Sequence, residues 1–314
     1  MAVTFVPDPV RVRVPATSAN LGPGFDALGL ALSLYDDVSA QIIPAGFRVA
    51  VTGEGAGELP DGDDHLVVRA ALATFDALGV TPPGLAVECV NRIPQARGLG
   101  SSSSAIVAGV LLARELVSGG PAAFDDVDAL RLAAELEGHP DNVAPCLLGG
   151  FTIAWREPGG ARAVSLAAAT GVRPVLFVPD ERGLTAAARA ALPGEVPHAD
   201  AARTAGRAAL LVHALTAAPD LLFPATEDRL HQRYRAGAAP ATFALVGALR
   251  EAGVAAVVSG AGPSVMALTE PPEQFLPGDG WTVRRLAVDQ SGARVARGTL
   301  GHAERDPVAA GRKS

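Results

Sequence analysis

Apolar residues follow two different spacings along this chain, and each spacing predicts a kind of element. Residues 10–14 alternate valine with arginine, which predicts a strand with one exposed face. Further strands are predicted at 38–43, 47–52, 85–90, 151–155, 173–178, 255–259 and 265–268. Helical spacing predicts helices at 66–78, 105–114, 125–137 and 245–252, and alanine-rich helices that start near 185 and 201.

The order of these elements indicates the fold class. Strands and helices are interleaved without the regular alternation of a Rossmann sheet, so we expect an α+β fold in two layers. Proline and glycine at 158–160 predict a boundary between two domains, 1–157 and 158–301. The polar residues 302–314 are expected to form a disordered tail.

Composition excludes several classes of protein. The chain has 314 residues, 49% of them hydrophobic and 19% charged, which is enough for a sizeable core. Its net charge of −7 argues against nucleic acid or an anionic membrane as a partner. Two cysteines, Cys89 and Cys146, cannot form a disulfide framework and are expected to be buried thiols. Without a signal layout or an apolar run of about 18 residues, a cytoplasmic protein is expected.

Residues 94–104 are rich in glycine and serine and lie between a predicted strand and a predicted helix. Glycines let a backbone approach an anion closely, and the first N–H groups of a helix favour negative charge. The serine hydroxyls can cap the helix or reach a metal ion. The segment therefore fits either a phosphate-binding loop or a well-capped turn.

The distribution of lysine narrows the phosphate interpretation. Lys313 is the only lysine in the chain. A Walker loop needs a lysine after its last glycine, and a protein kinase needs one on a strand, so both are excluded. If this chain handles ATP, it does so with backbone amides, serines, a metal ion and arginines.

Three other segments with glycine, serine or asparagine end a strand or a helix: 15–26, 138–142 and 259–264. Each fits a simple turn or part of a binding site. Asn20 and Asp26 fit an Asx-type turn or a carboxylate that holds a substrate amine. His139 fits a cation at a helix end or a substrate contact.

Several charged residues elsewhere also fit either an ordinary surface position or a place in a binding site. Glu135 and Glu137 are either solvated or part of a Mg²⁺ site with a serine hydroxyl. Arg189, Arg233 and Arg235 are either surface charges or ligands for a carboxylate or a transferring phosphate.

Four segments together resemble a known family. Residues 94–104 resemble the P-x-x-x-G-L-G-S-S phosphate loop of the GHMP kinases, and 259–264 resemble their third, glycine-rich motif. Residues 14–26 and 137–145 are similar to the homoserine kinases within that superfamily. The resemblance implies a ribosomal-S5-like N-terminal domain, a ferredoxin-like C-terminal domain, and ATP- and Mg²⁺-dependent phosphorylation of the L-homoserine hydroxyl in threonine synthesis. On this basis a homodimer is expected.

The resemblance also implies roles for individual residues. The triphosphate would be held by Pro94, Arg97, Gly98, Leu99, Gly100, Ser101, Ser102, Ser103 and Ser104, with Ser102 and Glu135 at Mg²⁺. Homoserine would be contacted by Asn20, Asp26, His139, Asn142, Thr185, Arg189, Arg235, Gly260 and Gly262, with Asp26 at its ammonium. Asn142 and Arg189 are candidate catalytic residues.

Two positions are less simply assigned. Asp141 matches the general base of mevalonate-kinase-like relatives, but homoserine kinases work without a dedicated base, so we expect Asp141 to be structural. The chain also departs from the family at His65-Leu66-Val67, where relatives carry Asn-Leu-Val near the adenine. This departure affects the expected nucleotide contact and leaves the expected fold unchanged.

Overall fold

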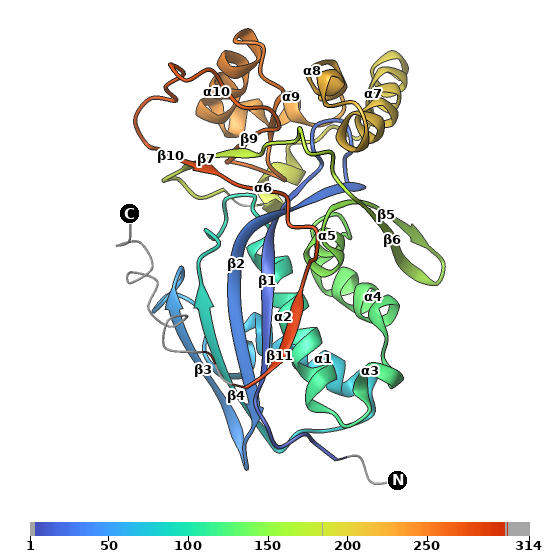
Figure 1. Cartoon of the computed structure of the whole chain (residues 1–314), viewed down its shortest axis with the longest axis vertical. Helices are drawn as coiled ribbons and strands as arrows, with labels where there is room; N and C mark the ends of the chain where they lie inside the picture. Colours follow the sequence, from blue (N-terminus) through green and yellow to red (C-terminus); the bar gives the residue numbers. More distant parts are fainter. Residues whose placement is uncertain (1–3, 184, 299, 301–314) are drawn as a thin grey trace.

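The computed structural model describes residues 4–183, 185–298 and 300, which form two layered bodies (Figure 1). In the described residues the larger sheet has the order β11-β1-β2-β4-β3, with β5 paired to β2 and β6 to β5. Its strands are β1 Val10–Ala19, β2 Leu28–Ile42, β3 Gly46–Gly53, β4 Gly84–Asn91, β5 Phe151–Glu157, β6 Gly160–Leu166 and β11 Arg294–Arg297. The smaller sheet, β10-β7-β9-β8, comprises β7 Val175–Pro179, β8 Ala256–Val258, β9 Val265–Ala267 and β10 Trp281–Arg285.

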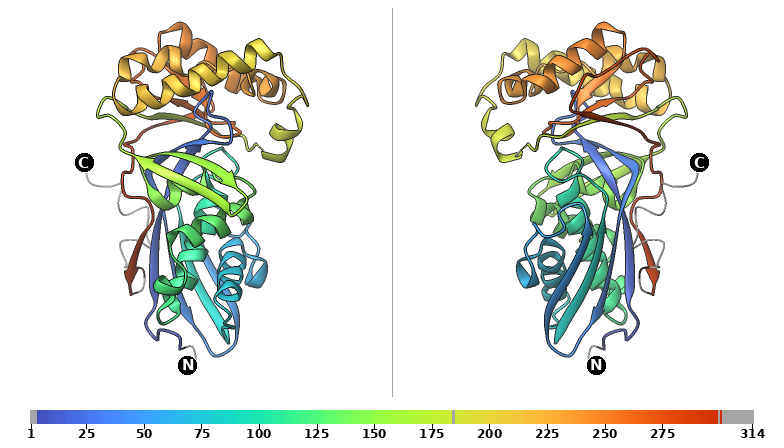
Figure 2. Two further views of the ribbon diagram at one scale, coloured as in Figure 1. Left: turned by 90° about the vertical axis from the view of Figure 1, so that its right-hand side faces the viewer. Right: turned by 90° about the vertical axis from the view of Figure 1, so that its left-hand side faces the viewer.

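Helices accompany each sheet. Beside the larger sheet lie α1 Leu66–Ala77, α2 Ser101–Leu116, α3 Gly120–Ala123, α4 Asp126–Glu137 and α5 Val143–Leu148 (Figures 1 and 2). The second body contains α6 Thr185–Ala190, α7 His198–Thr216, α8 Leu222–Ala225, α9 Gln232–Arg235 and α10 Pro240–Glu251. Short 3-10 turns lie at Gly62–Asp64, Pro219–Leu221 and Ala236–Ala238. The α+β class expected from the sequence is confirmed.

Strand β2 is longer than the strand predicted at 38–43, and it includes two buried acids, Asp36 and Asp37. Asp37 pairs with Arg13 at 2.7 Å and with Arg92 at 2.8 Å. Asp36 accepts hydrogen bonds from the backbone N–H groups of Arg92 and Ile93 at 2.6 and 2.9 Å. Burial nevertheless raises the pKa of Asp36 to about 7. These partners satisfy the two acids inside the sheet.

The predicted domain boundary at 157/158 is wrong. Glu157 pairs with Gly160, so the proline and glycines at 158–160 form the turn of the β5–β6 hairpin within the larger sheet. The chain leaves that sheet after Leu166 and returns to it at β11, which pairs with β1. The tail predicted for 302–314 lies outside the described residues.

The two bodies share an apolar core at their junction. Leu21, Leu30 and Leu99 from the first body belong to one buried cluster with Leu211 and Met266 from the second. The loop after β1 reaches into the second body, where His231 Nε2 donates a hydrogen bond to Gly22 O at 2.7 Å. Residues that line a site at this junction are therefore held by a common core. Among the described helices, none combines the length and the hydropathy that a membrane span requires.

Candidate active site

The glycine- and serine-rich loop leads directly into α2, the buried helix beside β1. Gly100 caps this helix at a φ of 70°, and no side chain accepts from its first N–H groups. A Cβ on Gly100 would lie 2.0 Å from Thr17 Oγ1, so only glycine fits this position without displacing its neighbour. The free N–H groups of the first turn suit an anion.

The third glycine-rich segment, residues 259–264, packs against the loop 94–104. A Cβ on Gly98 would lie 2.2 Å from Ser259 O, and Ser259 Oγ donates to Gly98 O at 2.7 Å. Gly260 N–H donates to Ala19 O at 3.1 Å. The loop that follows β8 therefore contacts the end of β1 at Ala19 and the phosphate-type loop, residues 94–104, at Gly98.

A cleft of about 260 Å³ lies between the two loops and the end of α4. It collects most of the side chains that the sequence assigned to a site. Among its lining residues are Asn20, Asp26, Leu99, Ser101, Ser102, Glu137, His139, Asp141, Asn142, Arg189, Arg235 and Gly260. The segments 15–26, 94–104, 138–142 and 259–264 thus meet at one place.

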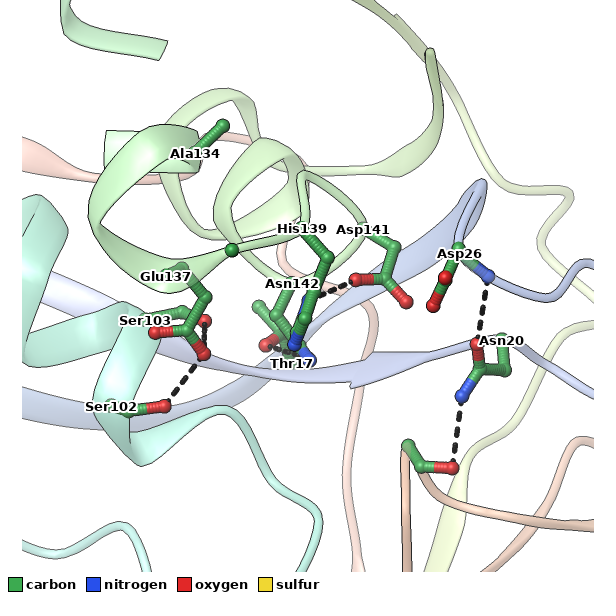
Figure 3. Close-up of polar contacts among 12 residues, drawn as sticks. Thr17, Asn20, Asp26, Ser102, Ser103, Ala134, Glu137, His139, Asp141 and Asn142 are labelled. Carbon is green, nitrogen blue, oxygen red and sulfur yellow. Dashed lines mark hydrogen bonds and ion pairs between the residues drawn. The ribbon is translucent and has the colours of Figure 1, made fainter. Parts of the chain in front are cut away.

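The carboxylate beside Ser102 belongs to Glu137, and the predicted pairing of Ser102 with Glu135 is wrong. Ser102 and Ser103 hydroxyls donate to Glu137 Oε1 at 2.7 and 2.9 Å (Figure 3). Glu135 is exposed and is absent from the lining of the cleft. Two residues along a helix correspond to a rotation of about 200°, which carries the two glutamates to opposite faces.

The segment after α4 holds three polar side chains in fixed positions. His139 Nδ1 donates to Asp141 Oδ1 at 2.6 Å, and Asp141 is only 2% exposed. The hydrogen bond to Asp141 raises the pKa of His139 despite its partial burial. Thr17 Oγ1 donates to Asn142 Oδ1 at 2.8 Å (Figure 3). Asp141 thus holds the His139 ring, and its expected structural role stays a prediction.

Asp26 and Arg189 face each other across the cleft. Arg189 donates two hydrogen bonds to the Asp26 carboxylate, at 2.8 and 2.9 Å. Asp26 itself has a φ of 56° and donates its backbone N–H to Asn20 Oδ1 at 3.0 Å. Asn20 Nδ2 in turn donates to Gly260 O at 2.9 Å (Figure 3). This small network thus runs from Arg189 in α6 to Gly260 in the third glycine-rich segment.

Arg235 is a second cation at the cleft, and it is 4% exposed. Its guanidinium donates to Ala188 O at 3.2 Å and to His231 Nδ1 at 3.1 Å. Burial lowers the pKa of Arg235. Arg233, the alternative two residues earlier, lies on the surface, where it pairs with Asp200 at 2.7 Å. The geometry thus selects Arg189 and Arg235 from the three candidate arginines.

Several expected nucleotide or substrate residues have other partners. Arg97 donates to Pro179 O, Asp180 O and Gln95 O at 2.8 to 2.9 Å, so its side chain ties the loop to the second body. The Ser104 hydroxyl donates to Pro15 O at 3.1 Å. Pro94 and Gly262 do not line the cleft, and Gly262 borders a neighbouring cavity. The side chain of Thr185, the first residue of α6, lies outside the described part of the chain.

A second pocket of about 400 Å³ adjoins the loop on its other side and shares Ser101 and Ser102 with the cleft. His65, in its wall, is 3% exposed and accepts a hydrogen bond from Val67 N–H at 3.3 Å through Nδ1. Its Nε2 atom is buried without a partner. Burial lowers the pKa of His65, so the ring is held neutral with its proton on Nε2.

Comparisons with known proteins agree with this geometry. Residues 65–150 match the model of the GHMP kinase N-terminal domain, and 205–275 match that of the C-terminal domain. The chain belongs to the GHMP kinase family. It is 57% identical over 290 residues to the homoserine kinase of Streptomyces coelicolor, covering 91% of this chain and 94% of that protein. It is 52% identical to the homoserine kinase of Clavibacter michiganensis, over 91% of this chain and 93% of that one.

Among solved structures, the homoserine kinase of Cytophaga hutchinsonii superposes with a TM-score of 0.78 at 28% identity, over 92% of this chain and 98% of that one. In this chain the phosphate-type loop contacts a second glycine-rich loop, because Ser259 Oγ donates to Gly98 O. Sequence reasoning considered both Glu135 and Glu137 but chose Glu135 as the partner of Ser102, and it missed the contact of Thr17 with Asn142. Glu137 ends the α4 pattern, and Thr17 lies in the 14–26 motif, so both were within the segments that carried the signal.

Proposed function

We propose that this protein transfers the terminal phosphate of ATP to the side-chain hydroxyl of L-homoserine. The homoserine kinase names of its relatives at 52–57% identity support this substrate. The observation that carries the proposal is one cleft that combines an uncapped helix start with an acid and two arginines. Such a cleft suits a polyanion and a zwitterionic amino acid together.

In this proposal the triphosphate lies against the first turn of α2 and the adenine occupies the adjoining pocket. The pocket of about 400 Å³ includes apolar residues such as Leu66 and Val38. Ser101 and Ser102 line both this pocket and the cleft, so the two lie next to each other, as a base joined to phosphates would require. His65 Nε2–H is then a donor for a ring nitrogen of the base.

The residues near Ser102 fit Mg²⁺ bound together with phosphate. Mg²⁺ keeps several waters and takes one or two protein oxygens beside substrate phosphates. The Ser102 hydroxyl and the Glu137 carboxylate supply such a pair. In the described residues no group of three or more histidine, cysteine or acidic side chains forms a metal cage. The ion would neutralise phosphate charge during transfer.

Homoserine would lie with its ammonium at Asp26 and its carboxylate at Arg189 and Arg235. Its hydroxyl would then extend toward Asn142 and His139, which line the same cleft nearer the helix α2 start. Phosphoryl transfer depends mainly on positioning and charge neutralisation. Asn142, held by Thr17, orients the hydroxyl, and we propose that its proton leaves to the phosphate without Asp141 as base.

A substrate panel tests this proposal. ADP release is measured by a coupled assay with L-homoserine, mevalonate and galactose at equal concentrations. The proposal expects turnover with L-homoserine at least ten times that with the other two. Preference for mevalonate or galactose would assign the protein to another branch of the family, and ATP binding without turnover would make it a non-catalytic relative. The homodimer and the cytoplasmic location stay predictions, and sedimentation of the purified protein tests the first.

A further inference from the structure

The ion pair of Asp26 and Arg189 occupies the two groups that the proposed substrate would need. Arg189 presents both terminal nitrogens to both oxygens of Asp26, at 2.8 and 2.9 Å. The acid comes from the loop after β1, and the arginine comes from α6 in the second body. Hydrogen bonding to Asp26 raises the pKa of Arg189 further above its usual range. Without ligand, the candidate ammonium site and one candidate carboxylate site therefore satisfy each other.

The surroundings give the pair one fixed side and one exchangeable side. Asp26 is fixed by the hydrogen bond from its backbone N–H to Asn20. The ring of Phe25 contacts both arginines: its centre lies 5.5 Å from the guanidinium carbon of Arg189 and 5.4 Å from that of Arg235. Arg235 is buried and tied to Ala188 and His231. The Arg189 side chain is 44% exposed, so water can solvate it during an exchange.

We propose that the Asp26–Arg189 pair is exchanged by the substrate and makes recognition depend on both charges of a zwitterion. An amino acid breaks one ion pair and forms two, because its ammonium replaces Arg189 at Asp26 and its carboxylate replaces Asp26 at Arg189. An amine alone leaves Arg189 without its carboxylate, and a carboxylate alone leaves Asp26 without its cation. The pair thus selects against molecules that carry only one of the two charges. This inference rests on the proposed function.

The exchange makes a prediction that simple binding groups do not. 3-Amino-1-propanol is homoserine without its carboxylate, and 4-hydroxybutyrate is homoserine without its amine. If Arg189 competes for Asp26, then Arg189→Gln binds 3-amino-1-propanol more tightly than the unmodified protein does. Asp26→Asn likewise binds 4-hydroxybutyrate more tightly. The expected gain is about two- to five-fold, the range of a partly exposed ion pair. Both variants bind L-homoserine more weakly.

Another ion pair of the chain offers a matched control. Arg182 and Glu58 form another exposed ion pair between the two bodies, at 2.7 Å, and neither residue lines the cleft. Arg182→Gln therefore removes a comparable contact and is expected to leave the binding of all three ligands unchanged. This variant separates ion-pair exchange from a general loosening of the two bodies.

The experiment measures dissociation constants of the three ligands by NMR titration of the full chain and of each variant. A gain for each singly charged ligand in its matching variant, with no gain in Arg182→Gln, supports the exchange. An unchanged, weaker or undetectable affinity for 3-amino-1-propanol in Arg189→Gln overturns it, and so does an equal gain in Arg182→Gln. ADP release with L-homoserine by the unmodified protein is measured in parallel, so failure of the proposed function is recognised separately.

Discussion

The Ser102 hydroxyl donates a 2.7 Å hydrogen bond to Glu137, joining the start of α2 to the end of α4. The Ser103 hydroxyl donates to the same carboxylate oxygen at 2.9 Å. This contact places an acid beside the first turn of a helix whose N–H groups are uncapped. The negative carboxylate of Glu137 thus lies beside the partly positive start of α2, as binding of a metal–phosphate complex requires.

Replacement of Glu137 by glutamine is expected to weaken Mg²⁺-dependent activity. The amide keeps the shape and can still accept the serine hydrogen bonds, but it loses the charge that a Mg²⁺ ligand needs. We expect the apparent Mg²⁺ affinity, or kcat/KM, to fall about 10- to 100-fold. Titration of activity against Mg²⁺ measures this. Glu135→Gln, two residues away on the exposed face, is the matched control, and an equal loss in it would contradict the assignment.

Gly100 should not tolerate a side chain. Alanine there would meet Thr17 Oγ1 and would also hold a left-handed backbone conformation, at a φ of 70°. Gly119 has a φ of 79° with nothing within 4 Å of its position for Cβ, so Gly119→Ala tests the backbone cost alone, about 1–2 kcal/mol. Thermal unfolding should show a larger loss for Gly100→Ala, together with loss of ATP binding. Equal losses in both variants would mean that the close contact with Thr17 is unimportant.

Asp141→Asn tests whether this acid is a general base. Asp141 holds the His139 ring, so we propose that its main role is to orient that ring. We expect turnover to fall by less than about 10³-fold, below the upper range of general-base contributions. Steady-state kinetics with a check of folding by circular dichroism measures this. A larger fall with the fold intact would make Asp141 the base.

The same pair predicts how stability depends on pH. The Asp141 hydrogen bond raises the pKa of His139 above its usual value of 6.5. Stability from this pair is therefore fully present below pH 6.5 and is lost as the pH rises through the higher pKa of the folded state. The stability difference between the unmodified protein and Asp141→Asn should be larger at acidic than at alkaline pH. Denaturant unfolding across this range measures it, and a difference that grows with pH would contradict the assignment.

His65 is expected to serve both the α1 helix and the neighbouring pocket. Its Nδ1 caps α1 by accepting from Val67 N–H, while Nε2 has no partner, and we propose that Nε2–H binds the nucleotide. His65→Ala should lose about 0.5–2 kcal/mol of stability from the cap and raise the KM for ATP. His65→Asn retains a capping oxygen and should recover most of the stability. Unchanged ATP affinity in His65→Ala would remove the histidine from the nucleotide site.

The phosphate-type loop was predictable because its signal is local. Glycines at 98 and 100 adopt the positive φ that a strand–loop–helix turn needs, and the helix follows immediately. The choice between Glu135 and Glu137 was not predictable from the sequence, because it depends on how α4 is rotated about its axis relative to α2. The path of β2 through Asp36 and Asp37 was not predictable either, because the groups that satisfy these acids come from β1 and from the residues after β4. Arg97 was assigned to the triphosphate from the family resemblance. Its partners in the structure, the backbone carbonyls of Pro179 and Asp180, leave no pattern in a sequence.

The central claim is that phosphate moves from ATP to the hydroxyl of L-homoserine, and identification of the product tests it most directly. Phosphorus NMR of a reaction with ATP, Mg²⁺ and L-homoserine should show a new phosphomonoester signal that grows in equal amount with ADP. Coupling of that signal to the protons on the terminal carbon of homoserine would locate the phosphate on the side-chain oxygen. ADP that accumulates with inorganic phosphate alone, or no ADP at all, would contradict the account.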